Sequence, residues 1–297
     1  MLDFKRVALE DKDIIESFLK QEYVMISDVN FTNLFLWRKS RSISFAIVED
    51  CLVIQTIYPS QKPFYFFPIG NGKKIKAIQK LIDFSKKRDE VLEFHSLEQE
   101  SVRFLEENFA NQFDFKLNRD RSDYIYSTAE LIALNGRKFH KKKNHLNKFL
   151  QTYPNFVFEI LNKSNIDEVL NVWRDWFEIH ENPSSGLINE NIGIIEVLKN
   201  WDALNIQGGL IRVDSKIVAF SFGEIVNQDM AVIHIEKADL RFNGAYQIIN
   251  QQLLENIFSQ VRYVNREEDL GIEGLRRAKM SYNPLFLLEK YDAYFIP

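Results

Sequence analysis

The order of apolar and polar residues in the first 134 positions predicts a sheet covered by helices. Short apolar runs bounded by turns are typical of buried strands. Two such runs flank the turn Glu49-Asp50, and helical spacing follows the glycine loop Gly70-Asn-Gly72. The predicted strands cover Ser44–Val48, Cys51–Tyr58, Phe64–Phe67 and Val91–Phe94, and the predicted helix covers Lys73–Lys87.

The same order of elements returns in the second half of the chain. A turn at Asp214-Ser215 again separates two strands, and a loop containing Arg241–Gly244 again precedes a helix, from about Ala245 to Phe258. Since the turn and the glycine loop fall at matching places, duplication explains the repeat better than coincidence. The second set of predicted strands covers Leu210–Val213, Ile217–Val226, Met230–Ile235 and Val261–Val264, and helical segments lead each half: Glu10–Gln21, Asn30–Trp37 and Asn165–His180.

A basic helix is predicted between the two halves, over Asn135–Leu150. Asn135 can cap its start, and Pro154 ends it. The pattern therefore predicts an α/β protein with mixed α+β sheets and three parts: an N-terminal domain (1–134), a connecting helix (135–154) and a C-terminal domain (155–297).

Composition excludes several classes of protein. No apolar run approaches the roughly 18 residues of a membrane span, and the N-terminus is too charged for a signal peptide. Cys51 is the single cysteine, which we expect in the core, and the five histidines show no metal-ligand spacing. The net charge of -4 argues against general coating of nucleic acid. We expect a cytoplasmic protein without a metal and with at most peripheral membrane contact.

The loop from Glu236 to Tyr246 is the strongest candidate for ligand binding. A glycine lets the backbone approach a ligand, and the free N–H groups at a helix start attract an anion such as a pyrophosphate. The run Arg241-Phe-Asn-Gly-Ala-Tyr246 resembles the pyrophosphate loop of the GNAT acyltransferases, R/Q-x-x-G-x-G/A, with Tyr246 in place of the last small residue. The predicted donor-phosphate residues are Arg241, Asn243, Gly244, Ala245 and Tyr246.

A charged segment, Tyr263–Pro284, is the candidate for catalysis. Transfer at a carbonyl needs a base for the attacking group and positive charge for the oxyanion. Carboxylates at the end of the strand can supply the base, Arg and Lys the positive charge, and Tyr282 a proton for the leaving group. A salt-bridged loop is the alternative interpretation for each residue alone. The predicted catalytic residues are Glu267, Asp269, Arg276, Lys279 and Tyr282.

The basic stretch Arg137–Lys148 can grip phosphates of a nucleic acid or of an anionic lipid. The predicted anion-binding residues are Lys141, Lys142 and Lys143. A charge run of this kind is equally typical of a solvated helix face.

Taken together, three segments resemble the DUF2156 family. They are the basic helix, the G-A-Y-x-x-I-N start of the later helix, and the stretch N-R-E-E-D-L-G-x-x-G-L-R-x-A-K-x-S-Y-N-P. The family is related to the C-terminal catalytic domain of phosphatidylglycerol lysyltransferases. The resemblance implies two tandem GNAT-like domains, as in the Fem-type enzymes, and transfer from an aminoacyl-tRNA to a lipid hydroxyl in the lipid-modifying relatives.

We therefore expect an acyl- or aminoacyltransferase. Its donor is coenzyme A/acyl-CoA or aminoacyl-tRNA, and its acceptor is a small-molecule or lipid amine or hydroxyl, with phosphatidylglycerol as one candidate. The N-terminal half lacks the arginine of the loop motif and is expected to be non-catalytic. The alternative is a ligand-binding sensor protein with a degenerate tandem GNAT fold.

Overall fold

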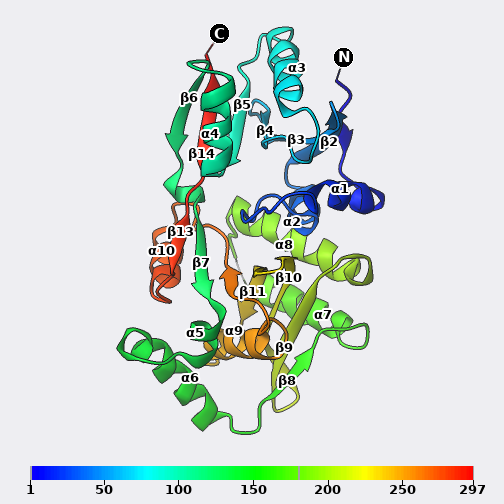
Figure 1. The fold of residues 1–297 in the computed structure, drawn as a ribbon. Helices are drawn as coiled ribbons and strands as arrows, with labels where there is room; N and C mark the ends of the chain where they lie inside the picture. Colours follow the sequence, from blue (N-terminus) through cyan, green and yellow to red (C-terminus); the bar gives the residue numbers. More distant parts are fainter. Residues whose placement is uncertain (1, 180, 297) are drawn as a thin grey trace. The chain divides into compact units, whose positions relative to one another are not determined.

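The computed structural model describes residues 2–179 and 181–296, which form two compact units. Unit 1 contains the residues up to Asp123 together with those from Leu288 onward, and unit 2 contains Tyr124–Leu287. Figure 1 labels the elements of both units.

Unit 1 is built on a seven-stranded mixed sheet. Its strand order is β1-β2-β3-β4-β5-β14-β6, in which β4 and β5 are parallel and the other neighbouring pairs are antiparallel. The strands are β1 (Lys5–Arg6), β2 (Ser42–Val48), β3 (Cys51–Ile57), β4 (Phe64–Tyr65), β5 (Glu93–Leu97), β6 (Phe113–Leu117) and β14 (Tyr291–Phe295).

Apolar faces of two helices cover this sheet and form its core. Ala77, Ile78 and Leu81 of α3 and Leu105 of α4 are fully buried against the strands, as is Cys51, which confirms its predicted place in the core. The helices of unit 1 are α1 (Lys12–Leu19), α2 (Phe31–Trp37), α3 (Lys74–Lys86) and α4 (Gln99–Asn108), with 3-10 turns at Leu9–Asp11 and Arg119–Arg121.

Unit 2 repeats the strand order of unit 1. Its sheet reads β8-β9-β10-β11-β12-β7-β13, so each strand has a counterpart at the same place in the other sheet, and β11 and β12 form the parallel pair. The strands are β7 (Asp123–Ser127), β8 (Val157–Ile160), β9 (Gln207–Val213), β10 (Lys216–Asn227), β11 (Met230–Ala238), β12 (Tyr263–Asn265) and β13 (Phe286–Leu288).

The core of unit 2 forms around α9, whose Ile248, Ile249 and Leu253 are fully buried. Leu146 and Phe149 of α6 belong to the same core. The helices of unit 2 are α5 (Thr128–Ala133), α6 (His140–Thr152), α7 (Ile166–Glu178), α8 (Ser185–Lys199), α9 (Ala245–Asn256) and α10 (Glu273–Met280), with 3-10 turns at Arg137–Phe139 and Trp201–Ala203.

The sixth strand of each sheet comes from the other half of the sequence. In unit 1, β14 of the last residues pairs with β5 and β6, and in unit 2, β7 of the first half pairs with β12 (Figure 1). The two halves therefore exchange one strand each, while the order of strands stays the same.

The repeat and the mixed α/β class predicted from the sequence are confirmed, but boundaries differ. The division of the chain falls at Asp123 and again at Leu288 because of the exchanged strands, rather than at residue 134.

The basic helix begins at His140, five residues after Asn135, because Gly136 has a φ of 86° and a 3-10 turn follows it. It packs into unit 2 instead of standing as a separate connector. The predicted helix Asn165–His180 ends at Glu178, and His180 lies outside the described residues.

Candidate functional site

The parallel strands β11 and β12 pair over three residues only. The pairs are Met230–Tyr263, Ala231–Val264 and Val232–Asn265. Two residues later β11 has a bulge at His234, because Phe222 pairs with Ile235 and Gly223 with Ile233. Bulges re-aim side chains and end pairing, and they are frequent near active sites. Beyond this point both strands carry charged residues.

His234 of β11 contacts two carboxylates, Glu224 of β10 and Glu267 of the loop that follows β12. Its Nδ1 lies 2.9 Å from Glu267 and its Nε2 lies 3.0 Å from Glu224. Burial disfavours the charged imidazole, but the two hydrogen bonds outweigh burial and raise the pKa of His234 to about 9. Burial raises the pKa of Glu267, although the imidazolium opposes it. Glu267 also has a φ of 57°, a conformation that costs energy in a residue other than glycine.

Arg266 and Glu236 form an ion pair next to this triad. Arg266 Nη2 donates to Glu236 Oε1 at 2.9 Å, and Asn250 of α9 donates to Glu236 Oε2 at 3.0 Å. The side chains of Arg266 and Glu236 are only 13% and 12% exposed. Within the described residues, the buried Nη1 of Arg266 has no hydrogen-bond partner. A buried donor without a partner is costly and is an available position for a ligand oxygen.

Tyr282 and Lys142 complete this cluster. The guanidinium of Arg266 lies 4.7 Å from the centre of the Tyr282 ring, and the ammonium of Lys142 lies 4.0 Å from it. Burial raises the pKa of Tyr282 to about 12. Burial, with the nearby Arg266, lowers the pKa of Lys142 to about 8. We call Lys142, Glu236, Arg266 and Tyr282 the transfer cluster. It holds two cations and one carboxylate in a partly buried space.

Three of the predicted catalytic residues hold the loop that follows β12. Asp269 accepts hydrogen bonds from Arg276 Nε and Nη2 (both 2.9 Å), from the Tyr124 hydroxyl (2.5 Å) and from the Gly271 amide (2.8 Å). Burial would raise the pKa of Asp269, but these bonds lower it well below the usual range. Lys279 donates to the carbonyls of Arg266 and Glu268, at 2.5 and 2.6 Å. These contacts fix the backbone that carries Arg266.

The predicted donor loop lies at the start of α9. The guanidinium of Arg241 pairs with Asp239 and its side chain is 77% exposed. Asn243 Oδ1 lies 3.1 Å from His145 Nδ1 of α6. Within the described residues, the amides of Asn243 and Gly244 have no acceptor. Ala245 is buried, and burial raises the pKa of Tyr246.

Gly244 is required by packing in this loop. Its φ is 92°, and a Cβ atom there would lie 2.4 Å from the carbonyl oxygen of His145 and 2.8 Å from Phe149 Cβ. The glycine therefore allows α9 to approach α6. Packing of the two helices, rather than the predicted close approach of a ligand, accounts for this glycine.

The three lysines predicted to bind anions have different surroundings. Lys142 belongs to the transfer cluster, Lys143 donates to Asn135 Oδ1 at 2.9 Å, and Lys141 is exposed. The exposed residues of α6 also include His140, His145 and Lys148.

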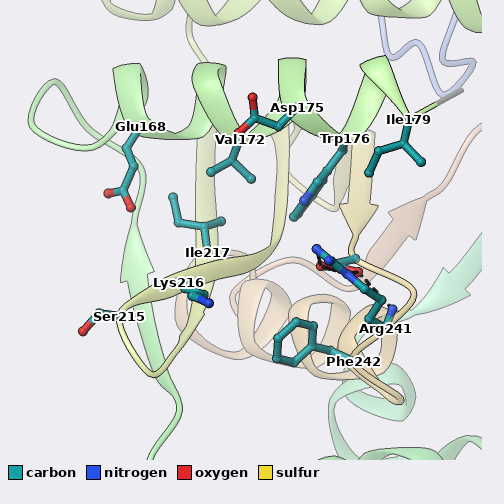
Figure 2. A pocket seen from close by; sticks show the side chains of 11 residues that line it. Glu168, Val172, Asp175, Trp176, Ile179, Ser215, Lys216, Ile217, Arg241 and Phe242 are labelled. Carbon is teal, nitrogen blue, oxygen red and sulfur yellow. Dashed lines mark hydrogen bonds and ion pairs between the residues drawn. The ribbon is translucent and has the colours of Figure 1, made fainter.

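A groove opens along α7 beside Arg241 (Figure 2). Its volume is about 540 Å³. Its lining residues are Glu168, Val172, Asp175, Trp176, Ile179, Ser215, Lys216, Ile217, Asp239, Arg241 and Phe242.

The described residues contain neither a metal-binding group nor a membrane-spanning helix. No group of three or more His, Cys, Asp or Glu side chains is placed to hold a metal ion. Among residues 2–179 and 181–296, no helix has the length and apolarity needed to cross a bilayer.

Sequence reasoning included Lys142 and Tyr282 but placed them in separate functions. Neither Glu236 nor Arg266 is among the predicted site residues. Arg266 and Glu236 are thirty positions apart, and their pairing depends on the register of β11 and β12. The signal in the sequence was a charged residue near the end of each of two neighbouring parallel strands: Glu236 lies in the last part of β11 and Arg266 directly follows β12.

Comparison with known proteins identifies a family. Residues 24–294 match the model described as phosphatidylglycerol lysyltransferase, C-terminal. A conserved protein of unknown function from Bacteroides thetaiotaomicron VPI-5482 is 36% identical, with all of both chains covered and a TM-score of 0.92. L-PGS from Bacillus licheniformis is 17% identical over 96% of this chain and 92% of that chain, with a TM-score of 0.66. The family match confirms the predicted family resemblance, and the two mixed sheets with one strand order confirm the predicted duplicated α/β fold class.

A curated relative matches over part of its length. An uncharacterized protein of Mycoplasmoides gallisepticum is 23% identical over 188 residues, which are 61% of this chain and 59% of that protein. The matched region thus spans about three fifths of the curated relative.

Proposed function

Since the chain belongs to the phosphatidylglycerol lysyltransferase C-terminal family, we propose that unit 2 transfers an aminoacyl group from an aminoacyl-tRNA to an acceptor hydroxyl or amine. Phosphatidylglycerol is the acceptor suggested by the family. The observation that carries the proposal is the transfer cluster at the opening between β11 and β12, where Lys142 and Arg266 lie against Tyr282.

The charge of this cluster suits transfer at a carbonyl. Attack on the ester carbonyl of the donor places a negative charge on its oxygen. Fixed positive groups in a water-poor site stabilise such a charge more than they would in water. The Nη1 of Arg266, which has no partner in the described structure, and the ammonium of Lys142 are the groups that we assign to this oxygen.

Two further groups are assigned to proton movements. Glu267, with its raised pKa, takes the proton of the attacking hydroxyl or amine, whereas Asp269 is held as an anion by Arg276 and Tyr124. The new bond joins the acceptor atom to the carbonyl carbon, and the ester bond to the tRNA ribose breaks. Tyr282 is protonated at neutral pH and gives its proton to the departing ribose oxygen.

The choice of tRNA as donor rests on the surface near the cluster. Exposed basic residues of α6 continue from Lys142 toward the loop before α9, where His145 meets Asn243. A row of cations binds phosphates of a polynucleotide with strong salt dependence. Arg241 and the amide of Asn243, both at exposed positions of the loop, can bind a phosphate of the donor.

The test is transfer of labelled aminoacyl groups from a mixed aminoacyl-tRNA pool to vesicles that contain phosphatidylglycerol, with hydroxylamine as a second acceptor. Loss of a general acid typically costs about 100-fold or more, so Tyr282→Phe should lower kcat by at least that factor with tRNA affinity unchanged. Tyr153→Phe is the matched control, since Tyr153 packs on Phe149 and Phe242.

Three results contradict parts of this proposal. Transfer from acyl-CoA, with none from any aminoacyl-tRNA, refutes the donor. Full activity of Tyr282→Phe refutes the role of the phenol. Ligand binding without turnover under all conditions favours the sensor alternative.

A further inference from the structure

The groove along α7 has the size and lining of a small-molecule site. Its volume of about 540 Å³ lies in the range of such sites. Val172, Trp176, Ile217 and Phe242 supply apolar side chains, as Figure 2 shows. The groove contains none of the residues of the transfer cluster, so it is a separate feature of unit 2.

Two aromatic rings in the groove are held by other rings. Trp176 lies on Phe220 with 6.0 Å between ring centres and 19° between planes, and Phe242 lies 5.3 Å from Tyr153. Both residues are half-buried, so part of each side chain remains accessible. Flat, fixed rings of this kind bind nucleobases by stacking.

Most of the charges around the groove are paired. Glu168 bonds with Arg212, and Asp239 bonds with Arg241. Within the described residues, the exposed carboxylate of Asp175 and the ammonium of Lys216 have neither a hydrogen bond nor an ion pair. Arg241 uses Nε and Nη2 for Asp239, which leaves other N–H groups of its guanidinium available.

We propose that this groove binds a nucleotide, with the base on Trp176 and Phe242 and the phosphate at Lys216 and Arg241. Asp175 accepts a hydrogen bond from a free ribose hydroxyl, as a carboxylate does in other nucleotide sites. A nucleotide combines the three chemistries that the groove offers: an aromatic plane, a ribose hydroxyl and an anion.

The groove is close enough to the transfer cluster to hold one end of a donor. Glu236 of the cluster and Asp239 of the groove are three residues apart at the end of β11, which corresponds to about 10 Å along an extended strand. This assignment to the donor rests on the proposed function. Both an aminoacyl-tRNA and coenzyme A end in a nucleotide, so either donor can supply the ligand of this groove. The experiment below distinguishes between the two donors.

The experiment is calorimetric titration of the whole chain with AMP, adenosine and ribose 5-phosphate. AMP should bind more tightly than either fragment. Stacking on an aromatic side chain contributes at least about 1 kcal/mol, so Trp176→Leu should weaken AMP binding by about tenfold. Lys216→Ala, at an exposed position, should lower AMP affinity toward that of adenosine. Lys199→Ala, at an exposed position at the end of α8 and outside the groove, is the matched control and should bind AMP as the wild type does.

Two results overturn the proposal: AMP that binds no better than ribose 5-phosphate, and equal AMP affinity in the wild type, Trp176→Leu and Lys216→Ala. Coenzyme A and an RNA minihelix ending in CCA are then tested as competitors of AMP. The competitor that displaces AMP from the wild type but not from Trp176→Leu identifies which donor carries the nucleotide. Since binding is measured without turnover, nucleotide binding in a protein that transfers nothing refutes only the proposed function. Transfer in a protein that binds no nucleotide refutes only the groove.

Discussion

The two sheets have one strand order but different contents at the parallel pair. In unit 1, the ring of Phe64 on β4 stacks on His95 of β5 at 4.2 Å, and Phe66 packs edge-on against Phe64. In unit 2, the corresponding region holds the His234 triad and the pair of Arg266 with Glu236. Aromatic packing fills the first junction, whereas the second retains polar groups that can meet a substrate.

The glycine loops differ in a similar way. In unit 1, the Gly70 amide donates to the carboxylate of Glu22 at 2.5 Å, and the Asn71 amide donates to Gln21 at 2.9 Å. In the described part of unit 2, the amides of Asn243 and Gly244 have no such partner. Under the proposed function, a side chain in unit 1 therefore takes the place that the donor phosphate takes in unit 2. The two loops differ in this contact while the order of strands in the two sheets is the same.

The largest expected effect concerns pH and the charged junction of unit 2. Since the pKa of His234 is raised to about 9 from 6.5, its charge stabilises the fold below about pH 6.5, and this stabilisation is lost as pH rises through 9. The free-energy advantage of the wild type over His234→Gln should fall by about 3 kcal/mol across this range. Urea unfolding from pH 6 to 10 measures it. As a control in the aromatic junction of unit 1, Phe64→Leu should lower the free energy of unfolding equally at all these pH values. A difference between the wild type and His234→Gln that does not change with pH would contradict the charged triad.

The next effect concerns the two glycines with positive φ in and near the basic region. A Cβ at Gly244 collides with α6, whereas a Cβ at Gly136 meets nothing within 4 Å. Gly136→Ala should cost about 1 kcal/mol for its backbone conformation alone. Gly244→Ala should cost about 2 kcal/mol more, because overpacking is added. Equal losses in chemical denaturation would show that α6 and α9 do not pack as closely as described.

The smallest effect concerns the occupied loop of unit 1. Glu22→Ala removes the carboxylate from the Gly70 amide and from Lys74, whose ammonium lies 2.6 Å from it, and should cost about 1.5 kcal/mol. Sulfate should restore part of this stability beyond chloride of the same ionic strength, because an anion can enter the vacated position. Glu106→Ala, on the exposed side of α4, should show no sulfate effect. An identical sulfate response in both variants would mean that the loop of unit 1 forms no anion site.

Local patterns predicted most of the fold. Apolar runs and turn residues identified β2, β3, β9, β10 and β11, and helical spacing identified α3, α7 and α9 within a few residues. The origin of the sixth strand in each sheet was not predictable in this way. The strands β7 and β14 are five residues long, and their partners lie far away along the chain, so no local pattern reports the exchange.

The candidate site was predicted in its segments but less well in its contacts. The sequence predicts the charged stretch after β12 as one catalytic segment, but its residues have different partners. Asp269 accepts hydrogen bonds from Arg276 and Tyr124, whereas Arg266 donates to Glu236. Which charges pair with each other depends on side-chain directions at the end of two diverging strands. A one-residue bulge at His234 changes these directions, and neither hydropathy nor motif spacing encodes it.

The exchange of strands also sets the order in which the chain can fold during synthesis. The gap between β5 and β6 is filled by residues 291–295, which leave the ribosome after every other strand of both sheets. Until then β5 and β6 expose unpaired backbone groups, which can recruit other chains. In the sheet of unit 2 the late strand is β13 (Phe286–Leu288), which lies at the edge, so the interior pairings of that sheet can form earlier. The N-terminal unit is therefore the last to be completed, and its nascent form is the state in which we expect chaperones to be needed.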